Sequence, residues 1–223
     1  MKRSEINQEI RAAEEFFARH SFKLPEFAAW SMEDWQKQDL EEIAEIFDCH
    51  LGWDITDFGR GEFRKAGLLL FTIRNGVNNS TLYPKKYAEK IMISRSGQLT
   101  LMHCHELKTE DIINRAGGRL IFELYNRKGR TSELDDTPVK LVMDGRKITV
   151  PAGGKVVLNP GESLTLTPNV FHAFYAEEGC DVMIGEVSSV NDDHTDNVFY
   201  EPQLRFPGVE EDEPIYRRTV MDY

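Results

Sequence analysis

The sequence has little cysteine, no long apolar run and no excess of positive charge, and each shortage excludes a class of protein. Its three cysteines are an odd number without the paired spacings of a disulfide framework or a zinc ribbon, which favours reduced, structural thiols. No stretch approaches the roughly 18 apolar residues of a membrane-spanning helix, and the N-terminus lacks the apolar core of a signal peptide. We therefore expect a cytoplasmic protein.

Acidic side chains outnumber basic ones by 38 to 27, so the formal net charge is −11. This charge repels phosphate backbones and anionic lipids, and we expect neither nucleic acid nor membrane as a partner. Hydrophobic residues make up 40% of the chain and charged residues 29%, as in ordinary globular proteins. A length of 223 residues suits one mainly β domain with an extension.

The beginning of the chain has helical periodicity. Residues 4–20 place apolar side chains at helical spacing among charges, which predicts an amphipathic helix. Ser31 followed by Asp34 resembles a capping signal and predicts a second helix that continues through Phe47 and ends near Gly52.

After residue 53 the sequence changes to short runs rich in β-branched and aromatic residues. Strands are expected at 68–74, 90–94, 99–105, 119–126, 139–143, 146–150, 155–158, 163–167, 170–177 and 182–187. Asp144-Gly145 predicts a two-residue hairpin, and Arg95-Ser96-Gly97 can turn a second one. Many short, evenly spaced strands are typical of a sandwich or barrel.

We accordingly divide the chain into three segments of a single structural domain. Residues 1–52 form an N-terminal helical extension that packs on the barrel, and residues 53–200 form the β-barrel. Residues 201–223, rich in prolines and acids, form a C-terminal strap or partner contact whose role cannot be deduced from the sequence.

Three histidines and one glutamate suggest a metal site. His103 and His105 are two residues apart in an expected strand, so the pleat directs both imidazoles to one face and directs Cys104 away from them. Glu110 follows across a loop that can bring its carboxylate over the imidazoles, and His172, in a later strand, is the candidate fourth ligand. Three nitrogens and one oxygen favour manganese, iron, cobalt, nickel or zinc over calcium or magnesium.

A single buried histidine is more often a hydrogen-bonded core residue than a ligand, but the combination is more specific. Gly97, His103, His105, Glu110 and Gly117 reproduce the spacing G-x5-H-x-H-x4-E-x6-G, which resembles the first motif of the cupin superfamily. That resemblance implies a jelly-roll-like β-barrel around the metal site.

The segment Pro168 to His172 resembles the second cupin motif, with Val170 in place of the usual glycine and Ala176 where asparagine is common. More closely, the chain resembles the D-lyxose isomerases, which have similar N-terminal helices and an EVSSVNDDHTDN-type segment, here Glu186 to Asn197. The resemblance implies a homodimeric, manganese-dependent enzyme that interconverts D-lyxose and D-xylulose, with D-mannose and D-fructose as related substrates.

Moving a carbonyl between two sugar carbons requires a base and a group that stabilises developing negative charge. Glu186 ends an otherwise apolar run, where burial would raise its pKa, and it is the leading base; a structural carboxylate paired with arginine is the alternative. Lys108 could hydrogen-bond the developing oxyanion or be solvated. Lys90 could bind sugar oxygens or lie on the surface.

The polar residues Asp192, Asp193 and His194 could bind hydroxyls, but capping of a turn is favoured. Two other functions remain open for the chain as a whole. A cupin dioxygenase with iron would use the same ligand set, and a non-catalytic sugar-binding cupin would also tolerate neutral ligands. An acid/base pair within reach of the metal distinguishes the isomerase from a binding module.

Overall fold

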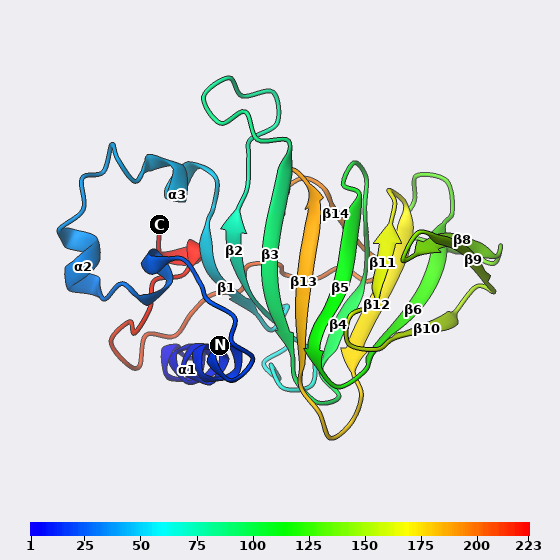
Figure 1. Ribbon diagram of the computed structural model, residues 1–223, viewed down its shortest axis with the longest axis horizontal. Helices are drawn as coiled ribbons and strands as arrows, with labels where there is room; N and C mark the ends of the chain where they lie inside the picture. Colours follow the sequence, from blue (N-terminus) through cyan, green and yellow to red (C-terminus); the bar gives the residue numbers. More distant parts are fainter.

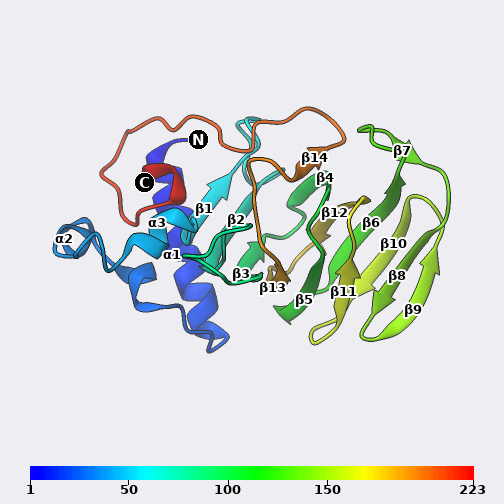
Figure 2. The same ribbon diagram turned by 90° about the horizontal axis from the view of Figure 1, so that it is seen from above.

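The computed structural model describes residues 1–223 and places two β-sheets face to face, with the helices gathered at one end (Figures 1 and 2). The helices are α1 (Arg3–Arg19), α2 (Met32–Gln36) and α3 (Ala44–Asp48), with 3-10 turns at Glu26–Ala29 and Val220–Asp222. The strands are β1 (Gly52–Thr56), β2 (Leu68–Arg74), β3 (Tyr87–Ser94), β4 (Leu99–His105), β5 (Glu110–Gly117), β6 (Leu120–Arg127), β7 (Leu134–Asp135), β8 (Val139–Met143), β9 (Arg146–Val150), β10 (Gly154–Leu158), β11 (Ser163–Leu166), β12 (Val170–Ala176), β13 (Val182–Ser189) and β14 (Asn197–Phe199).

One sheet has eight strands in the order β1-β2-β3-β13-β5-β11-β8-β9. The other sheet has six strands: five lie in the order β10-β6-β12-β4-β14, and the short β7 pairs with β6 outside this order. All the strand pairs within the two sheets are antiparallel. Consecutive strands repeatedly change sheet, as β3 and β4 do. This is the jelly-roll-like barrel that the sequence predicts.

The main hydrophobic core lies between the two sheets. β6 alternates buried and partly buried residues, and its inward side chains Leu120, Phe122 and Leu124 are fully buried. They pack with inward residues of the other sheet such as Leu164 and Ile184. Burial of each large apolar side chain contributes roughly 1.5–3 kcal/mol, so this core holds the sheets together around the inner cavity.

A second core joins α1 to the outer face of the larger sheet. Ile6, Ile10 and Phe17 of α1 pack against a group that includes Ile91 and Ile93 of β3. Lys90 precedes Ile91, and Met92 lies between the two isoleucines. Because side chains alternate along a strand, both point to the other face of the sheet. The helix therefore fixes which side chains of β3 reach the interior of the barrel.

The second predicted helix is broken. Ser31 caps α2 as expected, with a hydrogen bond from the Asp34 amide of 3.1 Å and a reciprocal bond from the Ser31 amide to the Asp34 carboxylate. However, α2 ends at Gln36 and α3 begins at Ala44. Asp39 accepts a hydrogen bond from the Glu41 amide at 2.8 Å, and such side-chain bonds to nearby amides compete with helix continuation.

One of the two predicted hairpins is confirmed. Asp144 and Gly145 both have positive φ, 47° and 77°, and connect β8 to β9 as neighbours. The other prediction is wrong, because the segment at Ser96 and Gly97 leads from β3 in one sheet to β4 in the other. Ser94 Oγ donates to the Gln98 carbonyl and accepts from the Ala176 amide at 3.0 Å, which directs the chain across to β12.

The C-terminal residues run along the barrel rim and then back over the helices (Figure 2). They return to α1, where the buried Arg3 pairs with Glu211 at 2.7 Å and with Asp222 at 2.6 Å. The two termini therefore lie at the same end of the molecule (Figure 1). On its way from β14 to the helices, the strap passes the cavity inside the barrel, which Arg205 lines. None of the helices is both long and apolar enough to cross a membrane.

Candidate active site

The three predicted histidine ligands lie together on neighbouring strands of the smaller sheet. His103 and His105 come from β4, and His172 comes from β12 directly opposite His103 in the strand register. The ring centroids of His103 and His172 are 4.2 Å apart, and one nitrogen from each of the three rings lies within 4.8 Å of the others. The i, i+2 spacing on one strand and the cross-strand pair on the next produce this cluster.

Glu110 reaches the same point from the opposite sheet. It is the first residue of β5, which follows a four-residue connection from β4. Its Oε1 is 3.2 Å from Nε2 of His172, and its Oε2 is 3.5 Å from Nε2 of His105. The residues predicted as ligands therefore converge, although the strand that begins at Glu110 was missed because its sequence, EDIINRAG, is poor in aromatic and β-branched residues.

The hydrogen bonds of the histidines leave Nε2 atoms directed at the centre of the cluster. Nδ1 of His103 is 2.7 Å from the Leu101 carbonyl, and Nδ1 of His172 is 3.0 Å from the Val170 carbonyl. A neutral imidazole that donates through Nδ1 has Nε2 free as a metal ligand. Nδ1 of His105 lies 3.7 Å from the carboxylate of Asp196, which can orient that ring in the same way.

The protonation states also suit metal binding. Burial inside the barrel lowers the pKa of His103 well below its usual value, and burial and Lys108 lower that of His105. Burial alone would raise the pKa of Glu110, but Lys108 and His105 hold it well below the usual range. Oε1 of Glu110 and both ring nitrogens of His105 are buried without a hydrogen-bond partner. A divalent cation would satisfy Oε1 of Glu110 and Nε2 of His105, so the residues fit a metal ion.

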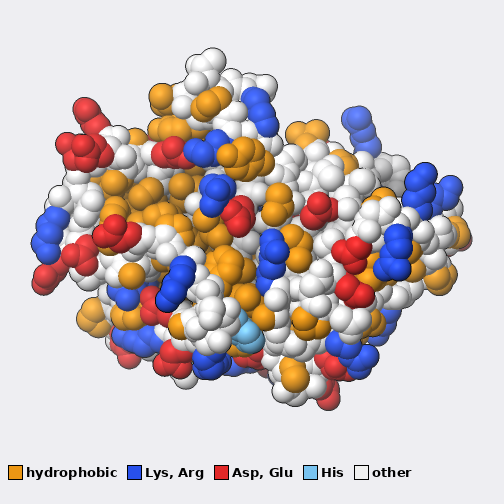
Figure 3. Space-filling model, viewed as in Figure 1, with side chains coloured by type: hydrophobic (Ala, Val, Ile, Leu, Met, Phe, Trp, Pro, Cys, Tyr) orange, Lys and Arg blue, Asp and Glu red, His pale blue; other side chains and the backbone are white.

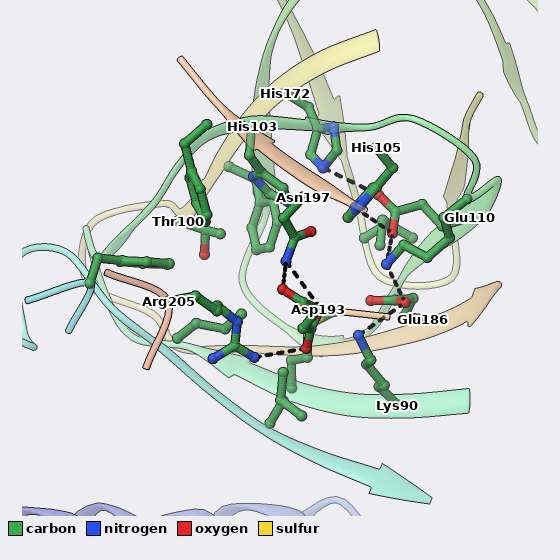
Figure 4. A pocket seen from close by; sticks show the side chains of 18 residues that line it. Lys90, Thr100, His103, His105, Glu110, His172, Glu186, Asp193, Asn197 and Arg205 are labelled. Atoms are coloured by element: carbon green, nitrogen blue, oxygen red, sulfur yellow. Dashed lines mark hydrogen bonds and ion pairs between the residues drawn. The ribbon is translucent and has the colours of Figure 1, made fainter. Parts of the chain in front are cut away.

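Two lysines, Lys90 and Lys108, and a second glutamate, Glu186, lie beside the cluster; Figure 4 labels Lys90 and Glu186. Nζ of Lys108 is 2.7 Å from Oε2 of Glu110 and 2.9 Å from Oε1 of Glu186. Nζ of Lys90 is 3.5 Å from the same oxygen of Glu186. All four side chains are buried and line one cavity. Glu186 and Lys90 face each other across the β13–β3 register, and both point inward because of strand alternation.

The prediction that Glu186 has a raised pKa is wrong. Burial acts in that direction, but the charges of Lys108 and Lys90 outweigh it and hold the pKa of Glu186 below its ordinary value. The same pairing raises the pKa of Lys108 far above its usual value, against the effect of burial. The sequence could not show this result, because the two lysines are remote from Glu186 along the chain. Glu186 is therefore an ionised carboxylate at neutral pH.

The far wall of the cavity contains residues that the sequence analysis missed as a group. Arg205 from the C-terminal strap pairs with Asp193 at 3.0 Å and also with Asp54 of β1. Burial alone would raise the pKa of Asp193, but Lys90 and Arg205 hold it well below its usual value. Asn197 donates to Asp193 at 3.2 Å (Figure 4). No sequence pattern distinguishes Arg205 from a surface arginine.

The polar loop before β14 divides its residues between two tasks. Asp192 caps the turn as predicted, because its carboxylate accepts hydrogen bonds from the amides of His194 and Thr195 at 3.1 and 3.2 Å. Asp193 instead lines the cavity, so capping describes only part of the loop. Cys104 is fully buried and is absent from the cavity lining, in agreement with the direction predicted from the pleat.

A jelly-roll-like barrel that gathers three imidazoles and a carboxylate around its inner cavity defines the protein as a cupin. Within this class, a sequence model of the D-lyxose isomerase family matches residues 1–223, and the chain belongs to that family. The protein is therefore a sugar isomerase.

Two relatives are similar over nearly the whole chain. The D-lyxose/D-mannose isomerase of Serratia proteamaculans is 49% identical over 215 residues, which cover 96% of this chain and 94% of the relative. The D-lyxose/D-mannose isomerase of Escherichia coli O157:H7 is 48% identical over the same shares.

Solved structures with a similar fold include L-ribose isomerases. The enzyme of Geodermatophilus obscurus has a TM-score of 0.62 at 13% identity, covering 94% of this chain and 98% of that one. The Acinetobacter sp. DL28 enzyme in complex with L-ribose has a TM-score of 0.60 at 14% identity, covering 90% and 93%. At these identities the likeness concerns the fold alone.

Proposed function

We propose that this sugar isomerase interconverts D-lyxose and D-xylulose, and D-mannose and D-fructose, with a divalent metal held by His103, His105, Glu110 and His172. The observation that carries the proposal is the buried Lys108–Glu186 pair at 2.9 Å, in the same cavity as these four side chains. A base and a cation in the same cavity as a candidate metal site are the groups that an aldose–ketose isomerisation requires.

Glu186 is the group proposed to take the proton from C2 of the aldose and return it to C1. Its carboxylate is ionised before the substrate arrives, since Lys108 and Lys90 lower its pKa, so it can accept a proton at neutral pH. The pairing makes it a weaker base than a carboxylate with a raised pKa. The C2 proton of the sugar must therefore become more acidic in the site. Positive groups that bind the adjacent sugar oxygens have this effect, because they stabilise the negative charge that develops when the proton leaves.

Lys108 and Lys90 are proposed to bind those oxygens. The ammonium of Lys108 lies between Glu110 and Glu186, so it is placed to donate a hydrogen bond to negative charge that develops on a sugar oxygen. Lys90 approaches Glu186 from the other side and donates to Asn191 at 2.5 Å, which holds it at the sugar-facing wall. Both cations line the cavity before a sugar binds.

A bound metal ion would supply Lewis-acid polarisation of the sugar's carbonyl and hydroxyl oxygens. Manganese is the proposed ion, from the family resemblance, and three nitrogens with one carboxylate would also accept cobalt, iron, nickel or zinc. The dioxygenase alternative uses the same ligands, and the binding-module alternative does not require the Lys108–Glu186 pair.

Two further proposals concern the state of the protein in the cell, namely a homodimer in the cytoplasm. The outer face of the larger sheet exposes Tyr87 of β3 and Val187 of β13, which are 48% and 43% exposed, and hydrophobic side chains gather on this face (Figure 3). Exposed apolar groups on a sheet face are suited to contact with a second copy. Sedimentation of the wild type and of a Val187→Glu variant would test the dimer.

The test of the proposed activity is turnover of a panel of pentoses and hexoses by metal-stripped protein, with and without added Mn²⁺, under anaerobic conditions. The expected result is manganese-dependent formation of D-xylulose from D-lyxose and of D-fructose from D-mannose. Ketose formation without oxygen excludes the dioxygenase. Absence of ketose from every sugar, with binding retained, would replace the proposal with the sugar-binding alternative.

A further inference from the structure

A second, larger chamber lies behind the far wall of the catalytic cavity. It measures about 470 Å³, against about 40 Å³ for the cavity that contains the histidine cluster. Its lining comes from the end of α3, the β2–β3 connection, the loop before β14, the strap and the C-terminus. Its polar lining includes Asp48, Asp54, Asn78, Asn191, Asp192 and Asp193.

The two spaces share a thin wall of paired polar side chains. Asp193 lines both of them. Arg205 lines the catalytic cavity and pairs with Asp54, which lines the chamber. Asn191, also in the chamber lining, accepts a hydrogen bond from Lys108 at 3.3 Å. A molecule in the chamber is thus separated from the catalytic lysines only by side chains.

The catalytic cavity is too small for its proposed substrate in this closed form. A buried water requires about 10–15 Å³ of such space, so 40 Å³ holds roughly three waters. A pentose has ten carbon and oxygen atoms. A sugar therefore needs more room than this cavity offers, and the chamber is the adjoining space large enough to hold one.

The strap that carries Arg205 is held at this point by side chains rather than by backbone pairing. The amide of Leu204 bonds to the Phe58 carbonyl and that of Glu210 bonds to the Met1 carbonyl. Between them the only main-chain hydrogen bond is from the N-terminal ammonium of Met1 to the Gly208 carbonyl, at 3.4 Å. Phe206 stacks on His194 with ring centroids 4.7 Å apart. Segments fixed by few contacts open at low free-energy cost.

We propose that the chamber is the entrance through which neutral sugars reach the catalytic cavity, and that the Asp54–Arg205–Asp193 ion pairs are the gate between them. This inference rests on the proposed function. The chamber's four carboxylates, Asp48, Asp54, Asp192 and Asp193, outnumber the single cation Arg205 in the wall, and this excess of negative charge disfavours phosphorylated sugars and accepts uncharged hydroxyl groups.

The experiment narrows the chamber without altering the catalytic residues. Asn78 is exposed in the β2–β3 connection and lines the chamber, so Asn78→Trp places an indole at its mouth without disturbing the core. Leu82→Trp is the matched control, since Leu82 is 73% exposed in the same connection and does not line the chamber. Met221→Trp obstructs the chamber from the C-terminal side and serves as a second variant.

The probe is the pentitol obtained by reducing D-lyxose, which binds without reacting. Its rate of exchange with Mn²⁺-loaded protein is measured from the broadening of its proton lines by the metal, and its affinity is measured by calorimetry. We expect exchange to slow about tenfold in Asn78→Trp and Met221→Trp with affinity within about twofold of wild type, because an obstructed path slows entry and exit equally. Leu82→Trp exchanges like the wild type.

Exchange in Asn78→Trp and Met221→Trp at the rate of Leu82→Trp would overturn the entrance, and so would an absence of pentitol binding to the wild type. If Asn78→Trp and Met221→Trp slow the exchange but the wild type forms no ketose from any sugar, the proposed entrance is supported and the proposed function is refuted. The two failures are therefore distinguishable.

Discussion

Replacing Glu186 by glutamine tests the proposed acid/base chemistry most directly. The substitution keeps the shape of the side chain and an oxygen that can accept from Lys108, but it removes the carboxylate that would accept a proton from carbon. General-base catalysis contributes roughly 10²–10⁴ in rate, which corresponds to about 3–5 kcal/mol of barrier. We therefore expect kcat for D-lyxose to fall by about 10²–10⁴ while metal content stays at the wild-type level.

Glu186→Gln should lower the free energy of unfolding only moderately, so unfolding should not be the cause of the lost activity. Lys108 keeps its contact with Glu110 at 2.7 Å, and Lys90 keeps its hydrogen bond to Asn191 at 2.5 Å. One charged hydrogen-bond partner is lost, so we expect about 1.5–3 kcal/mol of destabilisation in urea unfolding. The variant therefore remains folded at 25 °C, and its activity can be measured.

Glu89→Gln is the matched control. Glu89 precedes Lys90 on β3, points outward and pairs with Arg74 at 2.9 Å, so its amide should leave kcat unchanged. The assays are ketose formation at saturating Mn²⁺, metal analysis, and deuterium content of the ketose formed in D2O. A Glu186→Gln enzyme within threefold of wild type, or a wild type that never incorporates solvent deuterium, would refute proton transfer by Glu186.

Three further predictions follow from the site and the core. His103→Ala should lose bound metal and activity together, as measured by metal analysis and turnover, whereas His20→Ala, at an exposed ring beside Phe16, should change neither. Lys90→Met should move the acid limb of the pH profile of kcat/KM to higher pH, because it removes one of two cations that lower the pKa of Glu186; an unmoved limb would contradict that role. Phe122→Ala should destabilise the fold by about 3–5 kcal/mol in urea, because Phe122 is fully buried between the sheets, and a change below 1 kcal/mol would contradict its place in the core.

Local patterns were enough to predict several elements of the fold. The amphipathic helix at residues 4–20 corresponds to α1, and the strands expected at 68–74, 99–105, 139–143 and 146–150 have the bounds that the structure shows. The Asp144-Gly145 turn has the positive φ values of its hairpin type. These features depend on interactions within a few residues, which a single sequence contains in full.

Predictions that required knowledge of distant neighbours were less successful. The chain at Arg95 to Gly97 leaves β3 for the other sheet because Ser94 bonds to the Ala176 amide, and nothing nearby in sequence indicates that partner. The break between α2 and α3 follows from Asp39 bonding to the Glu41 amide, a local choice that the apolar spacing alone did not resolve.

The candidate ligand cluster is predictable from the sequence, since the two-residue period of β4 places His103 and His105 on one face and the motif spacing points to Glu110. The electrostatics around these residues depend on the fold. It brings Lys90, Lys108 and Glu186 together from three separate segments, and this proximity reverses the direction expected for the pKa of Glu186, the proposed base. It also places Arg205 of the strap at the cavity wall, because a charge pair between remote residues depends on how the chain folds back and not on any local pattern.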